Sequence, residues 1–422
     1  MSISTKKVIV IAGTTGVGKS QLSIQIASHF NGEVVNSDSM QVYKDIPIIT
    51  NKHPLEEREG VPHHVINHID WKDEYYLHRF EKECIEAIED IHSRGKIPVV
   101  VGGTHYYLQA LFNKSVKKDQ DQTKNRKITI DEQKILDSND SNLIFNALIK
   151  YDPKIADKYH PNDIRRVKRM LEIYYCTGKT PSETFAEQEN TLRYDTLFLC
   201  LFSDRAALNK RLDNRVDKML ELGGMEEIEQ LYKYYKENNY SIDQCENGVW
   251  QVIGFKEFLP WLEDKDNVKL EDCIERMKIR TRQYAKRQVK WIRNMLIPDI
   301  NGDIYLLNAT DLDQWNTLVS ERALRITTDF VNNNSISEAH APPELEKLLP
   351  NLENTTKPEG HFSCSICRNS DNSELTVIGK DQWNIHLKSR RHKHNLNRGA
   401  KLAAYEKWKA QNGSKIENER EN

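Results

Sequence analysis

The sequence of 422 residues contains no long hydrophobic run. No apolar stretch approaches the ~20 residues that a membrane-spanning helix needs, so we expect no membrane protein. The apolar stretch at 8–12 is too short for a secretory signal and leads directly into a glycine-rich loop. The seven cysteines form no even framework, and only one pair is closely spaced, which is typical of a protein from a reducing compartment.

A strong net charge is also missing, because 61 Lys and Arg residues offset 63 Asp and Glu residues to give -2. Bulk charge therefore predicts no nucleic-acid partner, but the distribution of charge does. The segment 276–294 carries many cations and no acidic residue, whereas solvated basic faces usually interleave acids. We favour a helix that faces a polyanion over a merely solvated one. Smaller basic clusters occur at 165–169 and 388–393.

The most informative feature that is present is the loop at 13–20, which satisfies G-x-x-x-x-G-K-[ST]. A buried strand is predicted before it at 8–11, and an amphipathic helix after it at 21–27. Such a loop turns backbone N–H groups toward phosphates, while Lys19 adds a charge and Ser20 a hydroxyl for Mg²⁺. We predict a di- or triphosphate site rather than an ordinary strand-to-helix turn. Its residues are Gly13, Thr14, Thr15, Gly16, Val17, Gly18, Lys19 and Ser20.

Three further apolar runs, at 33–36, 97–101 and 197–202, are predicted as parallel strands separated by helical sequence such as 76–93. The expected fold class is α/β: a parallel sheet like that of P-loop NTPases, with helices on both faces. The carboxyl ends of such strands meet at one edge, where ligands bind.

Polar residues stand at those strand ends. Asp38 and Thr104 follow two of the strands, and Asp204 follows a third. Asp38 is interpreted either as a general base or metal ligand or as a helix N-cap, with the choice open on position alone. For Asp204 a capping role is favoured, because a helix start follows it.

The length predicts two or three domains. Residues 114–134 are polar and aperiodic, and a helical insert follows at roughly 135–190 before the sheet resumes. The predicted division is a P-loop core at 1–113, a helical insertion at 114–195, the rest of the core with the basic helix at 196–330, a linker at 331–358, a Cys- and His-containing finger at 359–410 and a disordered tail at 411–422.

Near the carboxyl end, two thiols and two imidazoles have the spacing C-x₂-C and H-x₅-H. This set suits tetrahedral Zn²⁺, and Phe362 and Trp383 can supply a small core. The alternatives are a chance C-x₂-C beside a His-rich basic tail, or His394 as the fourth ligand. The helix is basic, so the module resembles the matrin or U1-type fingers that bind structured RNA. The predicted zinc ligands are Cys364, Cys367, His386 and His392.

In their order and number, the motifs resemble those of the tRNA dimethylallyltransferases (tRNA isopentenyltransferases) of the eukaryotic type. The resemblance covers roughly residues 7–300 and the finger. The motifs are GTTGVGKS at 13–20, NSDSMQVY at 36–43, PHH at 62–64, GGTHYY at 102–107, NDIRR at 162–166 with TGK at 177–179, QVIGFKE at 251–257 and RQYAKRQ at 282–288.

The resemblance implies transfer of the dimethylallyl group from dimethylallyl diphosphate to N6 of the adenosine 3′ of the anticodon (adenosine 37). The loop would hold the leaving diphosphate with Mg²⁺ near Ser20. The resemblance places Asp38 as the base that accepts the N6 proton, with Thr104 orienting the donor or the amine. Of the arginines at the diphosphate, Arg215 is our choice, with Arg211 behind it.

The resemblance also implies a flipped base and a grip on the anticodon stem-loop of tRNA, through phosphates and shape. We expect a monomer with no membrane partner. Cytoplasm is the expected location, with mitochondrial and nuclear pools as alternatives. The predicted tRNA-binding residues are Ser37, Ser39, Gln41, Tyr43, Arg165, Arg166, Arg169, Arg280, Arg282, Lys286, Arg287, Lys290, Arg390 and Arg391.

Two rival functions stay open. A P-loop kinase acting on a nucleoside or nucleotide would bind ATP and give a phosphorylated product. A non-catalytic RNA-binding protein would keep the loop as a remnant, although the complete motif argues against decay. Relatives that prenylate free AMP, ADP or ATP share the core, but such small substrates need neither a finger nor a basic helix.

Overall fold

The computed structural model describes residues 6–112, 126–186, 192–300, 303–349, 360–369, 374–398 and 404. The chain divides into two compact units. Unit 1 comprises Met1–Ser115 and Asn190–Glu353, and unit 2 comprises Val116–Glu189 and Asn354–Asn422. No helix within the described ranges is both long and apolar enough to cross a membrane.

Unit 1 is built on a parallel sheet of six strands in the order β3-β2-β4-β1-β5-β6. The four predicted strands are confirmed, and two very short strands at the sheet edges were not predicted. The bounds are β1 Lys7–Gly13, β2 Gly32–Asn36, β3 His63–His64, β4 Ile97–Val101, β5 Asp195–Phe202 and β6 Tyr305–Asn308.

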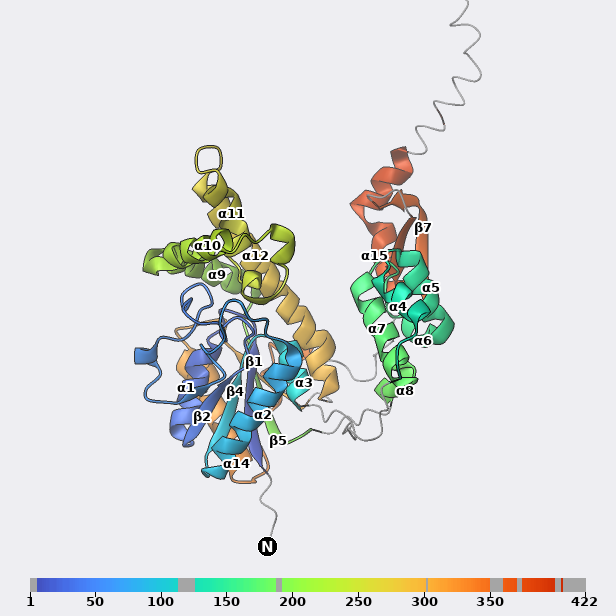
Figure 1. The fold of residues 1–422 in the computed structure, drawn as a ribbon. Helices are drawn as coiled ribbons and strands as arrows, with labels where there is room; N and C mark the ends of the chain where they lie inside the picture. The colour runs from blue at the N-terminus through green and yellow to red at the C-terminus, as the bar shows by residue number, and fades with distance from the viewer. Residues whose placement is uncertain are drawn as a thin grey trace, which may run out of the picture. The chain divides into compact units, whose positions relative to one another are not determined.

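Helices cover both faces of this sheet (Figure 1). Successive side chains of β1 point to opposite faces, so Val8 and Val10 join one apolar core and Ile9 and Ile11 the other. The first core includes α2 (Leu77–Ser93) and α3 (His105–Phe112), and the second includes α1 (Lys19–His29) and α14 (Arg322–Val331). The predicted α/β fold class is confirmed.

Further helices of unit 1 follow β5. Asp204 caps the first of them, since its Oδ1 accepts a 2.8 Å hydrogen bond from the amide of Ala206, so the capping interpretation is confirmed. The helices are α9 Arg205–Met219, α10 Met225–Glu237, α11 Phe255–Glu263, α12 Leu270–Trp291 and α13 Ile297–Asp299. Short helical turns are η1 Leu55–Glu57, η2 Leu220–Gly224, η3 Ile242–Gln244, η4 Gly248–Gln251, η5 Ile292–Leu296, η6 Asn316–Glu321 and η7 Glu346–Leu348.

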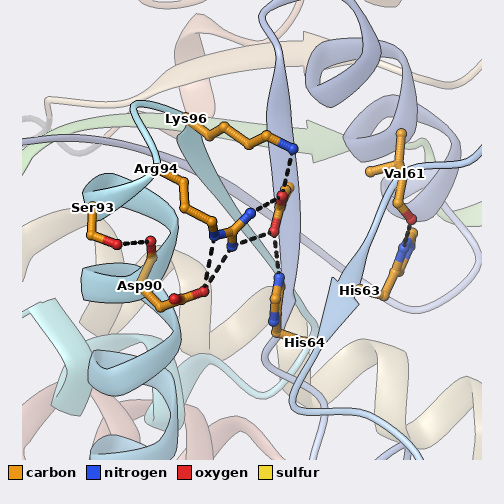
Figure 2. A network of polar contacts seen from close by, with 8 residues as sticks. Val61, His63, His64, Asp90, Ser93, Arg94 and Lys96 are labelled. Atoms are coloured by element: carbon orange, nitrogen blue, oxygen red, sulfur yellow. Dashed lines mark hydrogen bonds and ion pairs between the residues drawn. The ribbon is translucent and has the colours of Figure 1, made fainter.

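A network of polar contacts surrounds a buried carboxylate near the amino-terminal end of β2 (Figure 2). Glu33 of β2 is 1% exposed and accepts hydrogen bonds from Arg94 at 2.8 Å, from Lys96 at 2.7 Å and from His64 Nε2 at 2.7 Å. The Arg94 hydrogen bonds are the largest cause that holds the pKa of Glu33 far below its usual range. The network therefore ties the chain after α2 to the first residues of β2.

Unit 2 contains a helical insertion with its own apolar core, around Leu148, Leu171 and Tyr175. Its helices are α4 Ile130–Asp137, α5 Ser141–Tyr151, α6 Pro153–Ala156, α7 Ile164–Thr177 and α8 Pro181–Ala186. Side chains cap several of them, as when Asp163 Oδ1 accepts from the amide of Arg166 at 3.3 Å.

The finger of unit 2 consists of the antiparallel hairpin β7 (His361–Arg368) and β8 (Glu374–Ile378), followed by α15 (Lys380–Lys388). It contacts the insertion, because His160 Nε2 lies 3.1 Å from the carbonyl oxygen of Thr376. The predicted disordered tail at 411–422 and much of the loop at 114–134 lie outside the described residues.

The segment predicted as a linker, 331–358, differs from that prediction as far as residue 349. The carbonyl of His340 accepts a 2.7 Å hydrogen bond from the amide of Leu306 in the edge strand β6. Ala341 and Leu345 are buried in the first core of unit 1. Two buried apolar side chains and one main-chain hydrogen bond thus attach residues 340–345 to unit 1, although the Asn, Pro and Glu content of the segment is typical of a flexible linker.

Candidate active site

The glycine-rich loop joins β1 to α1, and the helix begins at Lys19, two residues before the predicted start at residue 21. Gly18 has φ +93°, a conformation that favours glycine. A Cβ at Gly18 would also lie 2.5 Å from the ring of Trp315, so no larger residue fits without movement. Residue 18 must therefore be a glycine, both because of its backbone conformation and because the ring of Trp315, the residue before η6, packs against it.

Lys19 points its ammonium group back along the loop, where Nζ donates a 2.6 Å hydrogen bond to the carbonyl of Thr14. The pKa of Lys19 is lowered to about 8, mainly by burial; Asp38 opposes this shift, and Arg215 contributes to it. Lys19, Asp38 and Arg215 thus form one electrostatic group, whose two cations face a single carboxylate. The net charge of this group is positive when all three side chains are ionised, which favours the binding of an anion.

Asp38 lies just beyond the end of β2. Its Oδ1 accepts a 2.9 Å hydrogen bond from the amide of Met40, and its own amide donates to Asn36 Oδ1 at 3.0 Å. Burial raises the pKa of the Asp38 carboxyl, while the Met40 amide and Lys19 oppose that rise. One carboxylate oxygen thus orders the turn, and a partly buried, more basic carboxyl is available for proton transfer.

Thr104 and Arg215 complete the group predicted from the sequence. Thr104 Oγ1 accepts a weak 3.4 Å hydrogen bond from the amide of Ser39, so the ends of β2 and β4 meet there. Arg215 Nη1 donates a 2.7 Å hydrogen bond to Thr15 Oγ1 in the loop. Burial lowers the pKa of Arg215 to about 10, which leaves it charged at neutral pH.

Two cavities meet at Asp38 and Arg215, and Thr104 lines neither of them. The first has a volume of about 410 Å³ and is lined also by residues of α12 and of the segment 246–257. The second, of about 270 Å³, is lined also by Lys19, Ser20 and the chain after β4. The residues that line both are Thr15, Asp38, Thr50, Asn51 and Arg215. Asp38 is thus accessible from two sides.

Some predicted residues do not join this group. Arg211 lines neither cavity, because its guanidinium donates to the carbonyl oxygens of Ala309, at 2.7 Å, and Thr310. Tyr43 is 1% exposed in the apolar core and Ser37 is fully buried, so neither presents a surface to RNA. Both follow β2 in sequence, but the turn at Asp38 directs them inward.

The other predicted residues near Asp38 are accessible. Ser39 lines the first cavity, and Gln41 lines the second while donating to the carbonyl of Asn51 at 3.0 Å.

The basic stretch forms most of α12. Arg280 and Arg287 line the first cavity, and Lys286 and Lys290 are exposed. Arg282 is engaged in ion pairs, with Glu275 at 2.9 Å and with Asp213, and Arg280 also pairs with Glu257 at 3.4 Å. A charge count along the sequence cannot separate these cases, because the acidic partners belong to other turns and helices.

Unit 2 contains the predicted metal-ligating group. The ligand atoms of Cys364, Cys367, His386 and His392 all lie within 4.8 Å of one another. His392 Nδ1 is 3.5 Å from Cys364 Sγ and 3.7 Å from Cys367 Sγ. The buried Nε2 of His386 has no hydrogen-bond partner, which is the condition expected of a nitrogen kept for a metal ion. Two sulfurs and two imidazoles at this spacing fit Zn²⁺.

Exposed cations flank the insertion and the finger in unit 2. On α7 these are Arg165, Arg166 and Arg169, although Arg166 and Arg169 also make ion pairs with acids one turn away. In the finger, Arg390 and Arg391 are exposed, and Arg391 donates to the carbonyl of Arg368.

The chain is similar to known proteins over most of its length. A family model described as IPP transferase matches residues 41–295. A tRNA dimethylallyltransferase of Saccharomyces cerevisiae is 64% identical over 419 residues, covering 98% of this chain and 97% of the relative. The chain belongs to the IPP transferase family. A human tRNA dimethylallyltransferase is 33% identical, with coverage of 94% of this chain and 87% of the relative.

Solved structures of IPP transferases agree with the fold. One, titled as crystallographic snapshots of a eukaryotic dimethylallyltransferase acting on tRNA, is 64% identical, with a TM-score of 0.88. The match covers 96% of this chain and all of that one. A tRNA isopentenylpyrophosphate transferase from Bacillus halodurans is 32% identical, with a TM-score of 0.53, and covers 78% of this chain.

Sequence analysis missed several residues that shape this IPP transferase site. Gln288 is 4% exposed and bonds to both the loop and the chain after β4. Glu227 of α10 accepts from the amides of Ile48, at 2.9 Å, and Ile49, at 2.8 Å, and so holds the segment that walls both cavities. The available signal was a single polar residue near the end of each amphipathic helix, Glu227 in the first turn of α10 and Gln288 in the last turn of α12.

Proposed function

We propose that this IPP transferase transfers the dimethylallyl group from dimethylallyl diphosphate to N6 of adenosine 37 in tRNA and releases diphosphate. The observation that carries the proposal is the position of Asp38, where two cavities meet. A donor in one cavity and a base in the other would approach the same carboxylate. The names of the full-length relatives support this substrate pair.

The second cavity is suited to the diphosphate. It is lined by Gly16, Gly18, Lys19 and Ser20, so loop amides and an ammonium face one space. Arg215 reaches the same space and lines both cavities. Ser20 and the diphosphate oxygens would hold Mg²⁺, which supplies further neutralisation of the leaving group.

The chemistry needs one proton acceptor and one stabilised leaving group. The bond between C1 of the dimethylallyl group and the bridging oxygen breaks, and the diphosphate leaves with the electron pair. The N6 lone pair forms the new C–N bond, and Asp38 accepts the proton that N6 gives up. Arg215 and Lys19 stabilise the charge that develops on the diphosphate. Thr104, whose Oγ1 accepts from the amide of Ser39, would orient the donor or the amine from the wall behind Asp38.

The first cavity would receive the adenosine. A base inside a stacked loop cannot reach Asp38, so it must be flipped out of the stack. Arg280 and Arg287 line the entrance, and Lys286 and Lys290 are exposed on the same helix. We assign the cations of α7 and of the finger to the anticodon stem, and Zn²⁺ to the ordering of the finger.

A labelled-donor assay tests the function. The purified protein, Mg²⁺ and undermodified tRNA are mixed with either labelled dimethylallyl diphosphate or ATP labelled in its γ-phosphate. We expect label to reach tRNA from the prenyl donor, with diphosphate released and no label transferred from ATP. Label moving from ATP would make the protein a kinase. Binding of tRNA without either transfer would favour a non-catalytic RNA-binding protein.

Free adenine nucleotides are the necessary second acceptor in this assay. If AMP, ADP or ATP were prenylated and tRNA were not, the acceptor would be the small nucleotide. We expect no such product, because the exposed cations of α12 serve a long polyanion better than a single nucleotide.

A further inference from the structure

One buried side chain joins the two loops at the candidate active site. Gln288 on α12 accepts a 2.8 Å hydrogen bond at Oε1 from the amide of Thr15, in the loop after β1. Its Nε2 donates a 2.7 Å hydrogen bond to the carbonyl of Gly103, in the chain after β4. The side chain is only 4% exposed, so water cannot easily replace either bond.

The surroundings are shaped to this amide. A Cβ on Gly103 would lie 2.4 Å from Gln288 Nε2, so the glycine permits the close approach. Thr15 is held a second time, by Arg215 at its hydroxyl. Through these contacts Gln288 fixes the start of the donor loop relative to Thr104, the next residue after Gly103.

The same helix carries the exposed cations. Lys286, Arg287 and Lys290 are exposed, whereas Gln288 and Ala285 are buried toward the body of unit 1. One turn before Gln288, Tyr284 makes side-chain hydrogen bonds to Thr104 and to Gln288 itself. A single helix thus has an outer basic face and an inner face that holds both loops.

We propose that Gln288 is a positioning residue that couples RNA binding on α12 to donor binding in the loop at 13–20. The inference rests on the proposed function, in which α12 contacts tRNA. RNA that seats α12 restricts the Gln288 amide and, through it, the amide of Thr15. Part of the ordering that the donor requires is then already complete, so each substrate tightens the binding of the other.

The experiment measures affinity for magnesium diphosphate with and without a saturating anticodon stem-loop RNA. We expect the RNA to tighten diphosphate binding to the native protein. In Gln288→Met, which keeps the volume but loses the hydrogen bonds to Thr15, Gly103 and Tyr284, diphosphate affinity should fall about ten-fold and no longer respond to RNA. RNA affinity without diphosphate should stay near the native value. Gln283→Met, an exposed change on the same helix, is the matched control and should behave like the native protein.

Unchanged coupling in Gln288→Met, or absence of coupling in the native protein, would overturn the proposal. If Gln288→Met does not fold, Gln288→Asn replaces it, because a side chain shorter by one carbon cannot reach Thr15 and Gly103 together. In steady-state transfer we expect the KM for the donor to rise more than kcat falls. The native protein is assayed for transfer in parallel, so failure of the proposed function appears there and not in the coupling.

Discussion

Arg215 and Thr15 are joined by a 2.7 Å hydrogen bond between a guanidinium on α9 and a hydroxyl in the loop at 13–20. This contact fixes the cation that lies on the boundary of both cavities. The same guanidinium can face an anion in either cavity, whereas Arg215 Nε is buried and has no hydrogen-bond partner. The relationship therefore gives one cation both a structural partner and a free side for chemistry.

Replacement of Arg215 by lysine tests that role. Arg215→Lys keeps the charge but loses the planar fork, so kcat/KM for the donor should fall about 10²-fold in steady-state transfer assays. Arg211→Lys is the control, since Arg211 binds main-chain carbonyls outside both cavities. It should reduce thermal stability more than activity, and equal losses of activity in the two variants would refute the assignment.

The pH dependence of transfer follows from Asp38 and Lys19. Burial raises the pKa of Asp38, so the base is protonated at acidic pH and kcat/KM should rise as the pH increases through that raised pKa. Burial lowers the pKa of Lys19 to about 8, so the free enzyme should bind the donor less well above that pH.

Asp38→Asn should lower kcat about 10²- to 10⁴-fold while leaving donor and RNA affinities near native values. A near-native rate of transfer by the Asp38→Asn variant would exclude Asp38 as the base.

Glu227 should act on the site from a distance. In Glu227→Gln one oxygen replaces the pair that holds the amides of Ile48 and Ile49, so the segment 46–51 should loosen around both cavities. We expect kcat/KM to fall about five- to ten-fold, equivalent to about one hydrogen bond. Glu226→Gln, an exposed neighbour, should have no effect. Identical kinetics for the two variants would show that the segment does not depend on Glu227.

Acid stability should depend on Glu33. Its pKa is lower in the folded protein than in the unfolded chain, so the folded state binds fewer protons and gains stability above the unfolded value of about 4. That contribution is lost as the pH falls through the folded pKa. Glu33→Gln should unfold more readily at neutral pH, by roughly 1–3 kcal/mol, with a flatter dependence on acid. Glu86→Gln, at an exposed ion pair, is the control; a parallel acid profile for both variants would contradict the prediction.

The finger should need its metal to grip RNA. Cys364→Ser removes one of the four candidate ligands, so the purified protein should lose its bound zinc, and the finger its order. We expect RNA affinity to fall clearly while donor affinity in unit 1 stays near native. Metal analysis and RNA titration measure the two effects. Zinc-free protein with native RNA affinity would make the finger irrelevant to tRNA, whereas Cys84→Ser, a change at a buried cysteine of unit 1, should retain zinc.

Local features of the sequence predicted much of the fold and part of the site. The loop at 13–20 and Asp38 were found because a strand end and a motif are both local, and the finger because ligand spacing is local. β3 was missed because two residues give no periodicity.

Long-range contacts set the limit of sequence analysis. Gln288 reaches Thr15 across 273 positions, and Arg282 finds Asp213 across 69. No pattern in one sequence reports such pairs. Tyr43 was placed at the RNA because of its neighbours in the motif, but its ring is large and apolar enough to be buried in the core. The predicted domain roles and the cytoplasmic location, with its mitochondrial and nuclear alternatives, stay predictions.

The pairing of β1 with β5 has a consequence for how this chain can change. Lys7 pairs with Asp195, 188 positions away, and the insertion of unit 2 lies between them in the sequence. The entropy of closing a loop grows only with the logarithm of its length, so doubling that excursion costs about 0.6 kcal/mol. The stability of the sheet therefore depends only weakly on the length of the segment inserted between β4 and β5. Evolution can lengthen, trim or replace the insertion there while the strands that carry the chemistry keep their register.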